Sequence, residues 1–179
     1  MAVHWRYRIG QFLNGLGARV SNAEVVDAMR SLPPGGITLF LQLPIDAQRH
    51  SLNVLAALER DGALEPDLAA AALLHDCGKM AAEGHISLWT RGPLVLLETL
   101  LPQVARRLAR PEPAGGWRHA LWVQQEHAAI GADWARQVGC SKETCWLIAH
   151  HQDPLPPETP DEADRMTTLR RLQEADGRN

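Results

Sequence analysis

The chain has 179 residues, of which 45% are hydrophobic and 22% charged, and its formal net charge is -3. This length allows a substantial core and demands no more than one domain, so we expect a single domain over residues 1–179. The pI near 6.2 gives no general reason to expect a nucleic-acid partner, and it leaves small anionic substrates open.

The cysteines and the apolar runs indicate a protein of the cytoplasm. Cys77, Cys140 and Cys145 are an odd number without paired spacing, and no signal peptide precedes the first amphipathic segment. The longest apolar run, residues 94–101, contains Glu98 and is too short to cross a bilayer. We therefore expect a reducing compartment and no transmembrane segment.

The first third of the chain predicts short helices. Apolar residues recur at intervals of three and four over residues 5–20, which indicates a helix. Ser21 and Glu24 have the spacing of a capping box, which predicts a second helix through about Leu32. Residues 37–43 could form a strand or a short helix, and their context favours the helix.

The next two predicted helices bring the first polar residues of interest. Residues 46–59 predict a helix with an apolar stripe of Leu52, Leu55 and Leu58, and Asp46 and His50 lie one turn apart on the same face. Pro66 suits the first turn of the following helix, whose apolar run over residues 68–74 ends at His75 and Asp76. Gly78 stands where the end of a helix favours a positive φ.

The second half of the chain also predicts helices that are interrupted by proline and glycine. We expect a loop to about residue 85, a helix over 87–110, a linker over 111–116 and a long helix over 117–138. Gly131, one turn after His127, would let another backbone approach closely. Gly139 ends that helix, Ser141 caps the next, and a last helix covers 161–175. These frequent interruptions predict an all-α orthogonal helical bundle.

Imidazoles and carboxylates recur at the ends or on the apolar faces of separate predicted helices. Buried charge must be paired, hydrogen-bonded or bound to a metal. Nitrogen ligands hold ions such as iron, manganese or zinc, and a carboxylate can bridge two ions, so the pattern predicts a two-metal site. Lys79 could neutralise a substrate phosphate. The candidate ligands are His50, His75, Asp76, His127, His150, His151 and Asp176.

These residues resemble the HD-domain metal-dependent phosphohydrolase superfamily. Its defining order is a histidine, a His-Asp pair and a distal aspartate, which here match His50, His75-Asp76 and Asp176, with Asp164 as the substitute for the last. Residues 72–79, Ala-Leu-Leu-His-Asp-Cys-Gly-Lys, are a close fit to the central motif of the family. The resemblance covers about residues 46–176, so the metal-binding core is expected over 44–179, and the helices of 1–43 stay unassigned.

Further histidines resemble those of branches that hold two or three ions. His127 and the pair His150-His151 are similar to the extra histidines of HD-GYP cyclic-di-nucleotide phosphodiesterases and of bacterial diadenosine tetraphosphatases. The Gly-Tyr-Pro element is absent, since residues 152–156 read Gln-Asp-Pro-Leu-Pro, and this disfavours a cyclic-di-nucleotide substrate. Trinuclear members have a glutamate one turn before the first histidine and a further histidine after the His-Asp pair. Asp46 and His85 could occupy comparable places, which leaves a third ion open.

Only one histidine of the adjacent pair should bind a metal. Neighbouring helical residues point about 100° apart, so one side chain should ligate while the other lines the pocket or touches phosphate. The family pattern favours His150 as the ligand and leaves His151 for the substrate.

The resemblance implies a metal-dependent phosphohydrolase that cleaves a phosphoester or phosphoanhydride by a metal-bridging hydroxide. Its substrate would be a small phosphorylated compound of the nucleotide class, and the oligomeric state is left open. The implied cofactors are two divalent ions, iron or manganese first, with zinc, magnesium, nickel or cobalt as alternatives. The implied ligands are His50, His75, Asp76, His127, His150 and Asp176, and the implied catalytic residues are Asp76, Lys79 and His151.

Two other functions use the same residues. Some di-iron members of the superfamily are oxygenases, and their ligands are the same. A non-catalytic regulatory module, in which the ions serve folding alone, is the third hypothesis.

Overall fold

The computed structural model describes residues 19–82, 94, 96–97, 100–111, 116–154 and 163–179. Across these ranges the secondary structure is helical, without strands, which confirms the predicted all-α class. The predicted helix over residues 5–20 lies almost wholly outside them. Of the helix predicted over 87–110, residues 87–93, 95 and 98–99 lie outside them, and the described part includes α7. The described elements are α2 (Asn22–Met29), α3 (Pro34–Gln42), α4 (Ile45–Asp61), α5 (Pro66–Leu74), the 3-10 helix η1 (Cys77–Ala82), α7 (Pro102–Leu108), α8 (Trp117–Gln137), α9 (Lys142–His150) and α10 (Ala163–Arg178).

The capping box predicted before α2 is present. The Ser21 side chain accepts a hydrogen bond from the backbone N–H of Glu24, and the Glu24 carboxylate accepts one from the backbone N–H of Ser21. The Arg49 guanidinium, on α4, donates to both oxygens of Glu24 at 2.8 and 2.9 Å. These hydrogen bonds from Arg49 and Ser21 lower the pKa of Glu24 to about 2. They fasten α2 to α4 next to His50.

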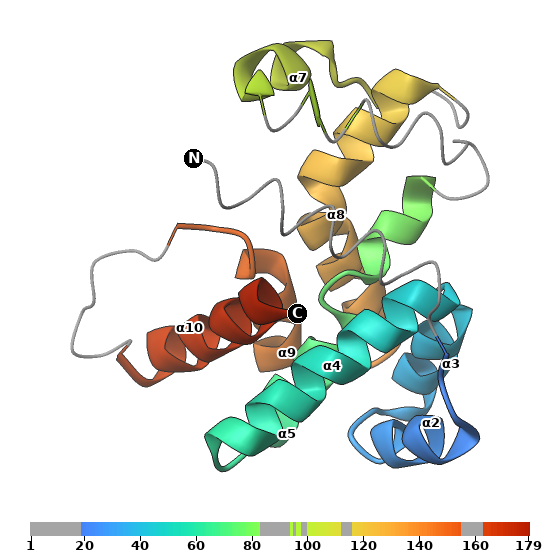
Figure 1. The fold of residues 1–179 in the computed structure, drawn as a ribbon, viewed down its shortest axis with the longest axis vertical. Helices are drawn as coiled ribbons and strands as arrows, with labels where there is room; N and C mark the ends of the chain where they lie inside the picture. The colour runs from blue at the N-terminus through green and yellow to red at the C-terminus, as the bar shows by residue number, and fades with distance from the viewer. Residues whose placement is uncertain (1–18, 83–93, 95, 98–99, 112–115, 155–162) are drawn as a thin grey trace.

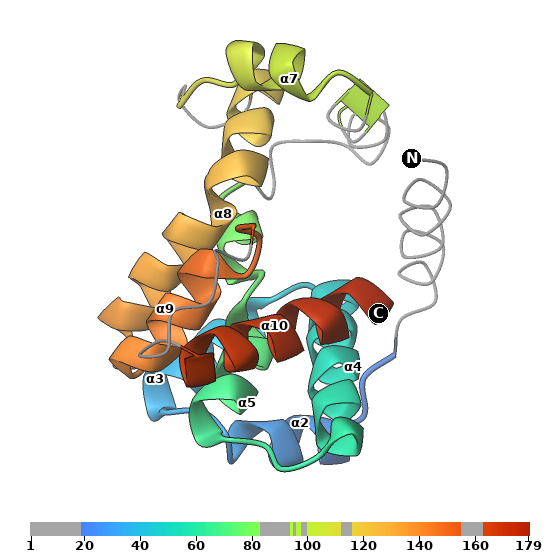
Figure 2. The ribbon, with the colours of Figure 1, turned by 90° about the vertical axis from the view of Figure 1, so that its left-hand side faces the viewer.

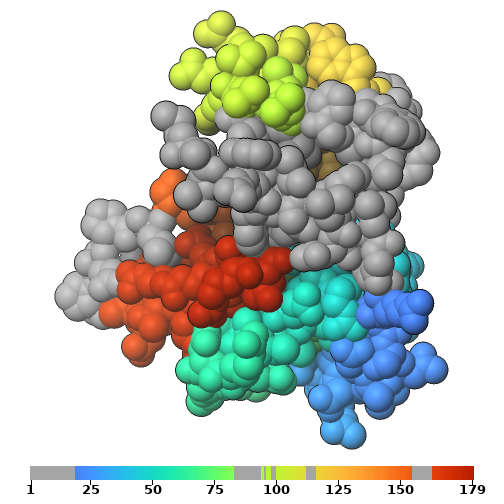
Figure 3. All heavy atoms as spheres, in the orientation of Figure 1, coloured from blue at the N-terminus to red at the C-terminus, as the bar shows by residue number. Residues whose placement is uncertain are grey.

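Helix α5 is the centre of the core. Every residue from Leu68 to Leu74 is buried, because α5 packs against α3, α4, α9 and α10. These helices form one body in both ribbon views, and α10 lies beside α4 on the face seen in Figure 3. The buried course of α5 brings the polar residues that follow it into the middle of the molecule.

Helix α8 links this body to α7. It packs against η1 and α9, and α7 lies beside its other end, away from α4 and α10 (Figures 1 and 2). A small second apolar cluster joins α7 and α8 through Ala105, Ala109 and Leu121. Among the described helices, none is both long enough and apolar enough to cross a membrane.

The prediction for Gly78 was wrong. Among the described residues, the glycines with positive φ are Gly62 and Gly139, and the second of these ends α8 as predicted. The chain does not leave α5 through a left-handed turn at Gly78. It continues as the 3-10 helix η1 through Ala82, where the sequence predicted a loop.

Candidate metal centre

The polar residues predicted for the site converge from several segments of the chain. His50 lies in the second turn of α4, His75 and Asp76 directly follow α5, and His127 lies on α8. His151 directly follows α9, and Asp176 lies near the end of α10. The ligand atoms form two groups, each within 4.8 Å of one another: His50, His75 and Asp176 in the first group, and Asp76, His127 and His151 in the second group.

Two glycines allow η1 and α8 to approach closely enough to join these groups. A Cβ atom on Gly78 would overlap the carbonyl oxygen of His127, and one on Gly131 would lie 3.2 Å from the Cys77 sulfur and the Gly78 nitrogen. This close contact confirms the prediction that another backbone approaches Gly131. It places Asp76, two residues before Gly78, against His127.

The Asp76 carboxylate faces both groups. Its Oδ2 lies 3.9 Å from His50 Nε2 and 3.7 Å from His75 Nε2. Its Oδ1 lies 3.3 Å from His127 Nε2 and 3.7 Å from His151 Nε2. One carboxylate thus offers a separate oxygen to each group, which is the arrangement of a bridging ligand between two ions.

The Asp176 carboxylate completes the first group. Its Oδ1 lies 2.9 Å from His50 Nε2 and 3.5 Å from His75 Nε2. The two Nε2 atoms are 3.3 Å apart. Two nitrogen atoms and one oxygen atom that could hold a metal ion therefore converge from α4, the end of α5 and α10.

Local hydrogen bonds fix how the buried histidines point. In each of three imidazoles the Nδ1–H group donates to the carbonyl oxygen three residues earlier, which leaves Nε2 facing the cluster. The bonds are His75 to Ala72 at 3.0 Å, His127 to Gln124 at 2.8 Å and His151 to Ile148 at 2.7 Å.

Two of these Nε2 atoms have no hydrogen-bond partner among the described residues. His127 is 0% exposed and His151 is 3% exposed, and the Nε2 atom of each is buried. Buried polar atoms are rarely left unsatisfied. In the neutral imidazoles these Nε2 lone pairs stand beside an oxygen of Asp76, where they repel it unless a cation lies between them. The residues present therefore fit a divalent ion.

The charges of the cluster are strongly coupled. Burial raises the pKa of Asp76, but Lys79 and His75 outweigh it and hold that pKa well below its usual range. The Lys79 Nζ atom is 2.6 Å from Asp76 Oδ2. Burial also raises the pKa of Asp176, and hydrogen bonds from His50 and His75 outweigh it, so the net shift is downward.

His75 is shifted in the opposite direction. Burial lowers its pKa, yet the charges of Asp76 and Asp176 raise it more, to about 9. Without a metal ion, His75 is therefore an imidazolium at neutral pH that partly balances the two carboxylates.

The structure brings His151, and not His150, into the cluster. The His150 side chain is 39% exposed, its Nδ1 lies 2.6 Å from Asp153 Oδ2, and its ring lies 4.6 Å from that of Trp146. His150, the expected ligand, therefore lies outside both groups, and His151, which was expected to line the pocket or touch phosphate, lies in the second group. The physical reason is that α9 runs to His150, so the next residue is rotated by about 100° towards the core. Nothing in the sequence alone marked which residue of the pair faces inwards.

The other candidate ligands lie apart from the two groups. Asp164 is exposed at the start of α10, so Asp176, rather than this substitute, supplies the distal carboxylate. Asp46 is exposed one turn before His50 and belongs to neither group. His85 lies outside the described residues. In the part of the chain that the structure describes, no third group of potential ligands is present for a third ion.

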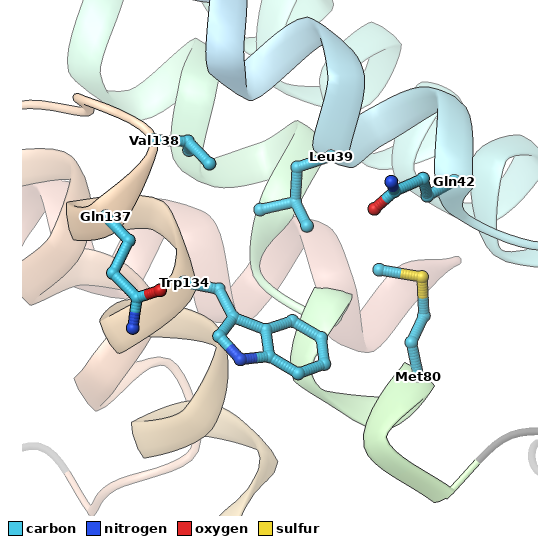
Figure 4. Close-up of a pocket in the computed structure, with 6 residues that line it drawn as sticks. All are labelled: Leu39, Gln42, Met80, Trp134, Gln137 and Val138. Atoms are coloured by element: carbon cyan, nitrogen blue, oxygen red, sulfur yellow. The ribbon is translucent and has the colours of Figure 1, made fainter.

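A separate hollow of about 300 Å³ contains none of the cluster residues. In Figure 4 the Trp134 indole, the Met80 thioether and Leu39 approach one another from α8, η1 and α3. Its other lining residues are Gln42, Gln137 and Val138. Cys77, which does not line this hollow, is fully buried. Burial raises the pKa of its thiol to about 12, so it packs against Gly131 as an uncharged group.

The fold and the site define an all-helical protein in which one carboxylate joins two groups of histidine and aspartate side chains. A family model of the HD domain matches residues 48–177, well over half of the chain. The chain therefore belongs to the HD domain family, and the resemblance to this superfamily is confirmed. No match was found among curated proteins or among solved structures. HD domains bind divalent metals and form a superfamily of metal-dependent phosphohydrolases, whereas the likeness to particular branches stays a prediction.

Proposed function

We propose that this protein is a metal-dependent phosphohydrolase that cleaves a phosphoester or phosphoanhydride of a small phosphorylated compound. The position of Asp76 carries the proposal, because its two oxygens face two separate groups of potential ligands. A purely structural ion usually has four protein ligands and no open position, and it needs no bridging carboxylate.

The ligand sets follow from the distances. One ion would be held by His50, His75, Asp176 and Oδ2 of Asp76. The other would be held by His127, His151 and Oδ1 of Asp76, which supply fewer ligands and leave coordination positions open. In this assignment His151 is a ligand, and His150 is not.

Two divalent ions bound there would supply Lewis acidity towards a phosphate and lower the pKa of a water molecule at the site. The residues of the chain do the remaining work. Asp76 keeps the groups together, and its low pKa means that it is ionised at neutral pH. Lys79, whose side chain is 40% exposed, places a positive charge beside Asp76 where an anionic substrate would arrive. The imidazoles of His75, His127 and His151 are buried, so little bulk water reaches that side of the site. The electrostatic interactions there are therefore stronger than they would be in water.

A nucleotide is the substrate class that the family resemblance supports. The net charge of the whole chain is -3, so an anionic substrate would depend on the local positive charge of Lys79 and the ions.

The test combines metal analysis with a panel of nucleotides and simple phosphoesters. We expect close to two ions per chain and phosphate release with Mn²⁺ in the absence of oxygen. His75→Ala and Asp76→Ala should lose both the ions and the turnover. Equal turnover in the variants and the unaltered protein would contradict the proposal. Turnover that requires oxygen and reduced iron would instead support the oxygenase, and stabilisation by metal without any turnover would support the regulatory module.

A further inference from the structure

Gln173 joins the two helices that carry the last ligand of each group. It lies on α10, and its side-chain Nε2 donates to the carbonyl oxygen of Asp153 at 2.9 Å and to that of His150 at 3.3 Å. Asp176 lies one turn further along α10, on a neighbouring part of the same face. His151 lies between the two residues whose carbonyls accept the bonds. One amide therefore connects the backbone around His151 with the helix that presents Asp176.

The hydrogen bonds from Gln173 matter because carbonyl groups at the end of α9 need donors. The last carbonyl groups of an α-helix have no partner within the helix, and a glycine in the left-handed conformation often caps them. Here the residue after α9 is His151, in the right-handed conformation with φ -62°. The Asp153 N–H donates to His150 O at 3.0 Å, and Gln173 from α10 supplies the other donor. Another helix thus completes the cap of α9.

We propose that Gln173 is a positioning residue of the metal centre, which sets the separation between the His50–His75–Asp176 group and the Asp76–His127–His151 group. This inference rests on the proposed function, because it assumes that both groups hold ions. The Ile148 carbonyl orients the His151 imidazole within its own helix, and Gln173 fixes that helix end relative to Asp176. Loss of the amide would remove none of the ligand side chains, but it would let the distance between the two groups vary.

The chain offers a matched control at the same helix pair. Arg165, near the start of α10, bonds to Glu143 of α9 at 2.9 Å and stacks on Trp146 at 3.8 Å. It fastens α10 to α9 as Gln173 does, but it makes no bond to the backbone around His151. Arg165→Gln therefore measures the cost of weakening this interface alone.

The experiment compares Gln173→Met, Gln173→Lys and Arg165→Gln by calorimetric titration with Mn²⁺ and by thermal unfolding of the metal-free proteins. Substitution of residues that orient metal ligands typically weakens metal binding 10- to 100-fold. We expect a loss of about tenfold for Gln173→Met, which keeps the length of the side chain but removes the hydrogen-bond donor. Gln173→Lys keeps a donor and should recover most of the affinity. Arg165→Gln should lower the thermal stability while leaving the Mn²⁺ affinity unchanged.

The outcomes separate this inference from the proposed function. Unchanged affinity in Gln173→Met, or equal losses in Gln173→Met and Arg165→Gln, would overturn the role of Gln173 and leave the metal centre intact. An unaltered protein that binds no Mn²⁺, like a His75→Ala reference, would overturn the proposed function itself. Gln173→Asn, whose shorter amide falls short of at least one carbonyl, gives the same contrast with a smaller change in volume.

Discussion

Gly78 packs so closely against His127 that the space for a Cβ atom is taken by the His127 carbonyl oxygen, and the Gly131 nitrogen would lie 2.7 Å away. Both obstacles are backbone atoms, which cannot rotate aside as a flexible side chain can. The contact between η1 and α8, and with it the place of Asp76 beside His127, depends on a hydrogen atom at this position.

Gly78→Ala should therefore destabilise the protein by about 1–3 kcal/mol, the usual cost of overpacking, and should weaken metal binding more than its loss of stability explains. Urea unfolding of the metal-free protein and Mn²⁺ titration provide the two measurements. Gly177→Ala is the control, since no atom of the described residues beyond its own turn of helix lies within 4 Å of its Cβ position, and it should gain up to about 1 kcal/mol of helix stability. Equal stabilities for both variants would contradict the packing argument.

His151→Ala and His150→Ala should have opposite effects on metal content. The first removes a buried Nε2 of the second group, so we expect the bound ions to fall from two to one. The second removes an outward-facing ring bonded to Asp153, so the metal content should stay the same. Elemental analysis distinguishes the variants. An ion in the second group, at 100 times its Kd, should also add about 2.7 kcal/mol to the stability of the unaltered protein, and His150→Ala should keep this contribution while His151→Ala loses it.

Mn²⁺ affinity should increase with pH because His75 must lose a proton to become a ligand. Its pKa is raised to about 9, since Asp76 and Asp176 outweigh the effect of burial. We expect the affinity to increase roughly tenfold per pH unit between neutral pH and about 9, and then to level off. Titrations near neutral pH in buffers of different ionisation enthalpy should show about one proton released per chain, from His75. A flat pH profile would mean that His75 is already neutral.

The same shift predicts how the metal-free protein responds to pH. A histidine whose pKa is higher in the folded than in the unfolded state stabilises the fold fully below its ordinary value of 6.5. This contribution is lost as the pH rises through about 9. Urea unfolding of the metal-free protein should therefore show decreasing stability between these values, while His75→Gln should respond less.

Lys79→Met should separate metal binding from turnover. The ammonium group lies 2.6 Å from Asp76 Oδ2 and competes with a cation for that oxygen, so its removal should leave Mn²⁺ affinity unchanged or higher. Turnover should fall by roughly 100-fold if the charge contacts the phosphate, as it does when a single stabilising group is removed from other active sites. A loss of metal together with activity would indicate that Lys79 only supports Asp76.

Much of the helical fold was predictable because its signals are local. The capping box at Ser21, proline in the first turn of α5 and the Gly139–Ser141 boundary all act within a few residues. Gly131 was also recognisable, because a glycine one turn from an inward histidine leaves room for a neighbour. Features that depend on short-range hydrogen bonds and steric contacts can therefore be predicted from the sequence.

Other features depend on packing between distant segments. The choice between His150 and His151 depends on the rotation of α9 about its axis, and the core sets that rotation. Gly78 looked like a helix terminus, yet its lack of a side chain serves contact with α8. The two-sided position of Asp76 arises only when α4, α8 and α10 meet around the end of α5.

His75, His127 and His151 each take their ring orientation from a carbonyl oxygen within the same or the immediately preceding helix. The aim of each ring is therefore a property of a single short segment and requires no neighbour to enforce it. When the helices pack together, these rings already have the orientation that faces the cluster. Binding a cation therefore costs little additional side-chain entropy.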